Sequence, residues 1–232
     1  MHLFYSTSVN GNAILLDKDE SRHLAKVLRL NIGDEVISID GKGTKYFCEV
    51  ALNHDKKSLL TIRSKEVQKK DFGIELGVAP TKNLNRWEWF LEKATELGID
   101  AIHPIQSYHS ERKILKRDRQ ERILVAAMKQ SYKSKLPHLS DLTPLKEIIN
   151  SEFEGQKFVA HCYDDIPKQN LKACFTTKKK ALILIGPEGD FSRQEVEQAI
   201  SKGFEPINLG KSRLRTETAA IIACHSILLL NE

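Results

Sequence analysis

Long apolar runs, closely spaced cysteines and internal repeats are all missing from this sequence of 232 residues. No uninterrupted apolar stretch approaches the roughly 20 residues that span a bilayer, which excludes a transmembrane helix. The first residues do not join a basic segment to an apolar one, so no secretory signal is expected. The content of 41% apolar and 29% charged residues is ordinary for a globular protein. We therefore predict a soluble, cytoplasmic protein without a membrane partner.

The few cysteines point to the same compartment. There are four, and they are widely separated: Cys48, Cys162, Cys174 and Cys224. No pair has the short spacing of a zinc clip or of a redox motif. We expect four reduced, structural thiols, as a reducing cytosol favours, and no metal site.

Positive charge is concentrated in one stretch. Residues Gln106–Pro137 carry nine Lys and Arg against three acids, a net charge of +6, whereas the whole chain carries +5. Clustered cations with few compensating acids are typical of a surface that contacts a phosphate backbone. A solvated helix face is the alternative interpretation of such a run.

The first seventy residues have the pattern of a small β-barrel. Short strands broken by turns are predicted at Ala13–Leu16, Glu35–Asp40, Lys45–Asn53 and Leu59–Val67. One helix, Asp19–Leu28, interrupts them. The Lys- and Gln-rich piece Val67–Asp71 is interpreted as a linker.

From Gly73 onward, strands and helices alternate, which favours a mainly parallel sheet covered by helices on both faces. The fold class is therefore α/β. Gly98 is expected to end the first helix, Ser192 and Glu195 to form a capping box, and Thr216 to cap the last helix. The predicted strands are Ile74–Ala79, Ala101–Ile105, Lys157–Cys162, Ala181–Ile185 and Pro206–Leu209, and the predicted helices are Leu84–Leu97, Arg119–Ser131, Ser192–Lys202 and Glu217–Leu230.

The first segment suited to a ligand is Leu182–Ser192, in which a buried strand is followed by a turn with two glycines and the capped start of a helix. Ligands of open α/β sheets bind at the carboxyl ends of strands. Gly186 and Gly189 allow the backbone to approach a ligand closely. The spacing matches neither a Rossmann fingerprint nor a P-loop, and Glu188 and Asp190 would repel a polyphosphate. An adenine or ribose edge suits the turn better, and a plain strand–helix turn is the alternative.

The second segment, Leu209–Ala220, also connects a strand to a helix. It places Arg213, Arg215 and two hydroxyls beside a helix N-terminus, where an anion or a polarised ring carbonyl binds favourably. The alternative is that one arginine pairs with Glu217 and merely fixes the loop.

Over nearly its full length the chain resembles the ribosomal RNA small-subunit methyltransferase E family, which methylates N3 of a specific uridine in 16S ribosomal RNA. Six ordered motifs carry the resemblance: His23–Leu30 with Gly33-Asp34, Lys93–Gly98, Ser110–Arg112, Lys129–Ser131, Ile185–Gly189, and Leu209-Gly210 with Leu214–Ala219.

This resemblance implies a PUA-like β-barrel for RNA binding at residues 1–70 and a SPOUT methyltransferase domain with a trefoil knot at residues 73–232. It also implies a homodimer and S-adenosyl-L-methionine as cofactor. The cofactor-binding residues would be Ile185, Gly186, Gly189, Leu209, Gly210, Leu214, Arg215 and Thr218. Asp190 departs from the family, which commonly has a third glycine there. Lys133 stands where the family often has arginine.

Methylation at uridine N3 removes a proton, so a cation must stabilise the charge that spreads onto the uracil carbonyls. Arg215 is the candidate for that role, and Arg112 is a second cation for positioning the substrate. No general base is assigned. Glu217 is conceivable as the base but is better suited to helix capping or to pairing with an arginine. His161 is conceivable as the base and equally suited to a place in the core. The RNA-binding candidates are Arg29, Arg112, Lys116, Arg119, Lys129 and Lys133.

Two other functions stay open on the sequence alone. A non-catalytic PUA-like RNA-binding protein would keep the basic stretch but leave the glycine turn without a role. A small-molecule α/β enzyme would use the turn but would give neither the barrel nor the cations a role. Replacing Gly186 or Gly189 with Val is expected to abolish cofactor binding and to leave the fold intact.

Overall fold

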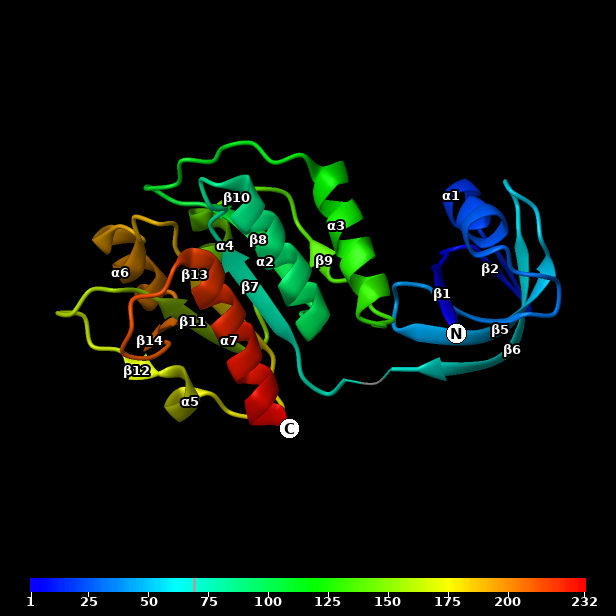
Figure 1. Cartoon of the computed structure of the whole chain (residues 1–232). Helices are drawn as coiled ribbons and strands as arrows, with labels where there is room; N and C mark the ends of the chain where they lie inside the picture. Colours follow the sequence, from blue (N-terminus) through cyan, green and yellow to red (C-terminus); the bar gives the residue numbers. More distant parts are fainter. Residues whose placement is uncertain (69) are drawn as a thin grey trace. The chain divides into compact units, whose positions relative to one another are not determined.

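The computed structural model describes residues 1–68 and 70–232, and Figure 1 shows its helices and strands. Two units divide the chain: Met1–Lys69 with Val125–Leu136, and Lys70–Leu124 with Pro137–Glu232. Of the predicted linker, Val67 ends the last strand of the first unit and Lys69 lies outside the described residues.

The first unit contains a six-stranded sheet in the order β1-β4-β5-β6-β3-β2. Its pairs are antiparallel apart from β1 with β4. The four predicted strands are confirmed to within one residue at each end, whereas the first two strands were missed because they are too short for a visible alternation. The strands are β1 His2–Tyr5, β2 Val9–Asn10, β3 Ala13–Leu15, β4 Glu35–Ile39, β5 Thr44–Leu52 and β6 Leu59–Val67.

The helix of this unit differs from the single helix predicted at Asp19–Leu28. It begins as α1 (Lys18–Arg22), where the Asp17 side chain accepts a hydrogen bond from the Glu20 amide at 2.8 Å. It then widens into the π-helix η1 (His23–Leu28) and ends at Arg29, whose φ of 53° is left-handed. Apolar periodicity does not distinguish the two helix types, because both bury one face.

Two apolar clusters support the first unit. The larger includes Phe4, Ile14, Leu24 and Val36, all fully buried. In the smaller, Met128 packs with Ile39, which places residues 125–136 among the partners of this sheet.

The second unit is built on a parallel sheet in the order β10-β8-β7-β13-β11-β14-β12, with β9 paired to β8. All five predicted strands are present. The three that were missed are only two residues long. The strands are β7 Ile74–Val78, β8 Ala101–Gln106, β9 His138–Leu139, β10 Thr143–Pro144, β11 Gln156–Ala160, β12 Gln169–Asn170, β13 Ala181–Ile185 and β14 Glu205–Asn208.

Helices cover both faces of this sheet, as predicted. All five residues of β13 are buried; Leu182 and Leu184 pack in a cluster with α4 and α6 residues. Because the side chains of a strand point alternately to opposite faces of the sheet, the other residues of β13 lie on the second face. Helix α7 contacts β7 and β13 and covers that face. In Figure 1, α7 and α2 run side by side, in agreement with their contacts. The helices are α2 Leu84–Leu97, α3 Arg117–Gln130, α4 Leu145–Asn150, α5 Leu171–Cys174, α6 Arg193–Ser201 and α7 Thr216–Asn231.

Two of the three predicted helix ends are confirmed. Gly98 follows α2 with a φ of 86°, a left-handed conformation that glycine adopts without a steric penalty. Ser192 and Glu195 form a reciprocal capping box at the start of α6. The third, a Thr216 cap on α7, is wrong: the N-cap residue is Arg215, which supplies no capping side chain.

Candidate functional site

Three parallel strands of the second unit bring the two candidate segments together. The central one is β11, whose last residue, Ala160, pairs with Ile185 of β13 on one side and Ile207 of β14 on the other. Because parallel strands end at the same edge, the turn after Ile185 and the loop after β14 begin next to each other. All eight predicted cofactor-binding residues lie on these two segments.

The segments are also joined by a direct hydrogen bond. The Thr216 hydroxyl, buried at the first position of α7, donates to the Gly186 carbonyl at 3.0 Å. The Thr216 hydroxyl is thus engaged outside its own helix. The turn after β13 and the start of α7 are thereby fixed to each other.

The turn after β13 is closed by the Asp190 amide, which donates to the Pro187 carbonyl at 2.9 Å. Asp190 itself has a φ of 63°, a left-handed conformation that glycine adopts at lower cost. Its carboxylate accepts hydrogen bonds from the amides of Cys162 (2.7 Å) and Phe191 (2.8 Å). The extra carboxylate is therefore a brace between this turn and the end of β11.

We expect Asp190→Ala to lower the free energy of unfolding by about 2–3 kcal/mol, because two amides lose a charged acceptor while the left-handed backbone stays strained. Asp190→Gly should be about 1 kcal/mol more stable than Asp190→Ala, since glycine relieves that strain. Urea titrations of the three proteins measure both differences. Equal stability of Asp190→Ala and the parent chain would show that the brace contributes nothing.

The two glycines of this turn are packed against the protein's own atoms. A Cβ on Gly186 would lie 2.9 Å from the Phe191 amide nitrogen, and one on Gly189 would lie 3.1 Å from the His109 Cβ. The expectation that Val at Gly186 leaves the fold intact is therefore wrong, because the branch would displace backbone without any ligand present. Gly210 differs: its φ is 128° and a Cβ there would meet nothing within 4 Å. Among the described residues, the space beside Gly210 is therefore open.

The second loop presents main-chain amides and cations. No side chain caps α7, so amides of its first turn remain available to an acceptor. Lys211, Arg213 and Arg215 are exposed, and no described residue forms an ion pair with any of them. Glu217, the alternative partner for an arginine of the loop, instead faces Arg86 at 3.8 Å. The positive charge of this loop is thus free to act on a ligand.

Arg112, the second predicted cation, holds the loop between β7 and α2. Its guanidinium donates to the Thr81 carbonyl at 3.1 Å and to the Lys82 carbonyl. The Lys82 amide in turn donates to the Glu188 carboxylate at 3.0 Å. Because carbonyl oxygens carry no net charge, Arg112 keeps its full positive charge beside the glycine turn.

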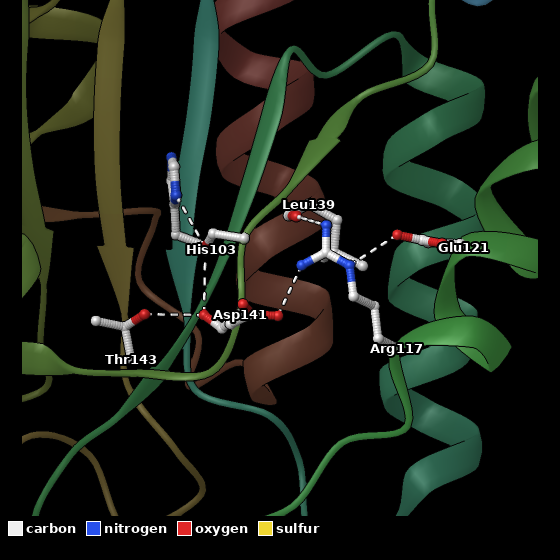
Figure 2. Close-up of polar contacts among 7 residues, drawn as sticks. His103, Arg117, Glu121, Leu139, Asp141 and Thr143 are labelled. Carbon is white, nitrogen blue, oxygen red and sulfur yellow. Dashed lines mark hydrogen bonds and ion pairs between the residues drawn. The ribbon is translucent and has the colours of Figure 1, made fainter.

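The basic stretch is less available than its composition suggests. Figure 2 shows the Arg117 guanidinium fully engaged, with Glu121 (2.7 Å), Asp141 (2.6 Å) and the Leu139 carbonyl (3.0 Å).

Two of the predicted RNA-binding residues also have acidic partners. Arg119 pairs with Glu88 at 2.6 Å, and Lys129 pairs with Glu20. By contrast, the side chains of Arg29, Lys116 and Lys133 have no hydrogen bond or ion pair to any described residue. Together with Arg112, whose partners are carbonyl oxygens, these three are the members of the predicted set without an acidic partner among the described residues.

Sequence reasoning missed the contribution of the loop after β8. His109 accompanies the glycine turn, with its Nδ1 3.0 Å from the Asp190 carbonyl oxygen. Next to it, Tyr108 is 79% exposed, and its amide donates to Glu195 at 2.8 Å. No motif marks these residues, because the contact joins positions about eighty residues apart.

His161, which the sequence left between core and site, follows the last residue of β11 and is 6% exposed. Neither ring nitrogen has a hydrogen-bond partner in the described part of the chain. Burial is the largest cause that lowers its pKa; Lys168 acts in the same direction, whereas Asp190 and Asp165 oppose it. The neutral ring is therefore favoured.

All four cysteines are free, and burial raises the pKa of Cys48 to about 11 and that of Cys224 to about 12. None of the helices in the described ranges combines the length and apolar character that a membrane crossing requires. Within the same ranges, no three His, Cys, Asp or Glu side chains are grouped so that they could hold a metal ion.

Comparison with known proteins identifies both units. Residues 16–62 match the model of an RNA methyltransferase PUA domain, and residues 68–228 match that of an RNA methyltransferase domain. A ribosomal RNA small subunit methyltransferase E of Aquifex aeolicus is 34% identical, with 99% of each chain covered. The enzyme of that name from Bacillus subtilis is 29% identical, over 90% of this chain and 87% of its own.

Solved structures agree with these matches. A probable rRNA methyltransferase from Porphyromonas gingivalis superimposes with a TM-score of 0.91 and 36% identity, covering 100% of this chain and 98% of its own. A ribosomal RNA small subunit methyltransferase E from Neisseria gonorrhoeae, solved bound to S-adenosyl methionine, has a TM-score of 0.87 and 25% identity, with coverage of 100% and 98%. The PUA-like and parallel-sheet folds are confirmed. The trefoil knot stays a prediction.

Proposed function

The chain belongs to the ribosomal RNA small subunit methyltransferase E family, and from this premise we propose that it transfers the methyl group of S-adenosylmethionine to N3 of a specific uridine in 16S ribosomal RNA. The observation that carries the proposal is the joined pair of segments at the edge of β13, β11 and β14. That edge offers backbone atoms, uncapped amides and unpaired cations within one site.

The residues at this edge fit the cofactor. S-adenosylmethionine has a carboxylate, for which the uncapped start of α7 and the cations of the second loop are suitable partners. Its adenosine half is polar but uncharged, and suits the backbone of a turn whose glycines carry no side chain. The residues proposed to hold it are Ile185, Gly186, Gly189, Leu209, Gly210, Leu214, Arg215 and Thr218.

Bound S-adenosylmethionine supplies a methyl group already activated by a sulfonium. The protein must then place the uracil N3 in line with that methyl group and stabilise the charge left when the N3 proton departs. We assign the second task to Arg215, whose side chain is exposed and has no acidic partner among the described residues. Arg112 positions the substrate from the loop between β7 and α2, which it holds and which contacts the glycine turn through Glu188.

The RNA contacts are assigned to both units. We propose that residues 1–70 serve as the RNA-binding domain and residues 73–232 as the methyltransferase domain, with contacts from Arg29, Arg112, Lys116, Arg119, Lys129 and Lys133. Action in the cytoplasm and assembly into a homodimer are part of the same proposal. In support of the dimer, the apolar helix α7 leaves Leu229 52% exposed.

Two measurements test the function against its alternatives. Calorimetric titration with S-adenosylmethionine should give a saturable heat, and its absence would favour a non-catalytic RNA-binding protein. Mass spectrometry of 16S ribosomal RNA after incubation with the protein and the cofactor should detect one N3-methyluridine. Binding of the cofactor without any modification of ribosomal RNA would favour the small-molecule enzyme.

We expect RNA binding to weaken steeply with salt, because phosphate contacts release counterions. Lys116→Gln and Lys133→Gln should each make the slope of log K against log salt shallower by roughly 0.7, the value for one contact to a single strand. Lys146→Gln, which removes the same charge from an exposed position in α4, is the matched control and should leave the slope unchanged. Filter binding across a salt series measures all four slopes, and equal slopes would remove both lysines from the interface.

A further inference from the structure

The two nitrogens of His161 are the feature of this site that the function so far leaves unexplained. A buried polar atom without a hydrogen bond costs free energy comparable to a lost bond. Both Nδ1 and Nε2 are in that condition among the described residues, and the side chain is only 6% exposed. An apolar residue would fill the same space at lower cost.

The groups around His161 are already engaged with one another. The Asp190 carboxylate accepts from the Cys162 and Phe191 amides. Lys168 donates to the Tyr163 carbonyl at 2.6 Å, and the Tyr163 hydroxyl donates to the Phe191 carbonyl at 2.9 Å. The imidazole is therefore the member of this cluster whose hydrogen-bonding capacity is left over.

The position of His161 relates that capacity to the cofactor site. It follows Ala160, which pairs with Ile185 and Ile207. His161 thus stands at the end of the central strand, between the starts of the two segments to which the cofactor is assigned. A ligand bound by both segments would therefore lie next to the end of this strand.

Building on the proposed function, we propose that His161 is a cofactor-binding residue whose neutral imidazole hydrogen-bonds the adenosine half of S-adenosylmethionine through one donor and one acceptor nitrogen. The uncharged half is chosen because a buried neutral ring is suited to hydroxyls and ring nitrogens. The charged amino-acid half is better served by the cations and amides of the second loop. The lowering of the His161 pKa by burial agrees with a ring that carries no charge.

The test compares His161→Phe with the parent chain by calorimetry, using S-adenosylmethionine and 5′-methylthioadenosine, which contains the adenosine half without the amino acid. We expect affinity for both ligands to fall by the same factor, about tenfold to a hundredfold, as for the loss of one or two hydrogen bonds. Without ligand, the unfolding temperature should be unchanged or higher, because two unpaired buried atoms are removed. His138→Phe, a change at an exposed histidine of β9, should alter neither affinity.

Unchanged affinity of His161→Phe for both ligands would overturn the inference and leave the proposed function standing. A loss confined to S-adenosylmethionine would overturn the assignment to the adenosine half. A parent chain that binds neither ligand would instead contradict the proposed function itself.

A second measurement covers the case in which His161→Phe fails to fold. Nitrogen-15 NMR of the parent chain should then show both His161 ring nitrogens shifting when 5′-methylthioadenosine is added. Unshifted resonances at saturation would overturn the inference.

Discussion

Replacing Arg215 with alanine is expected to lower kcat for methylation of 16S ribosomal RNA by roughly 10²–10³-fold, the usual cost of removing one group that stabilises charge in a transition state. The charge in question develops on the uracil carbonyls as the N3 proton leaves. Arg215 suits this role because its side chain is exposed and no described acid pairs with it. The nearby acid, Glu217, faces Arg86 instead.

The affinity for S-adenosylmethionine should change little in Arg215→Ala, because we assign the cofactor contact of this residue to its backbone and because Lys211 and Arg213 remain for the cofactor carboxylate. Arg213→Ala is the matched control, because it removes an equally exposed arginine two residues earlier in the loop. Arg215→Lys should recover only part of the rate, because an ammonium lacks the planar fork of a guanidinium. Transfer of labelled methyl groups measures kcat. An equal loss in Arg213→Ala and Arg215→Ala would assign the effect to the net charge of the loop.

The elements that could be predicted from the sequence are those with a long local pattern. Leu84–Leu97 is a helix between the same two residues in the prediction and in the structure, because its apolar period and its terminal glycine agree. The short strands β9, β10 and β12 have no such signal, since they exist only through pairing with a neighbour. The switch from α1 to the π-helix η1 is invisible for a related reason: both forms bury Leu24.

The candidate site divides in the same way. Its two segments were identified because each lies between a strand and a helix, which is a local property. The bond from Thr216 to Gly186 spans thirty residues, and the contact from His109 to Asp190 spans eighty-one, so neither leaves a mark in the local sequence. The pairing of Arg119 and Lys129 in the basic stretch could not be predicted for the same reason, because their acidic partners come from other elements.

Gly186→Ala is expected to abolish measurable binding of S-adenosylmethionine and to destabilise the second unit by about 1–3 kcal/mol, the usual cost of overpacking. The added Cβ would lie 2.9 Å from the Phe191 nitrogen and 3.1 Å from the Asp190 carbonyl carbon, so backbone must move. Any such movement also displaces the Gly186 carbonyl that receives the Thr216 hydroxyl. Both cofactor segments would then shift together.

Gly189→Ala separates this effect from a general intolerance of the turn. Its Cβ would meet only the His109 side chain, at 3.1 Å, and a side chain yields more easily than backbone. We therefore expect Gly189→Ala to lose less than 1 kcal/mol and to keep an affinity within about tenfold of the parent chain. Thermal unfolding and calorimetry on both variants provide the comparison. Equal losses in the two would mean that the turn tolerates no side chain at either position, whereas full affinity in Gly186→Ala would place the cofactor away from this edge of the sheet.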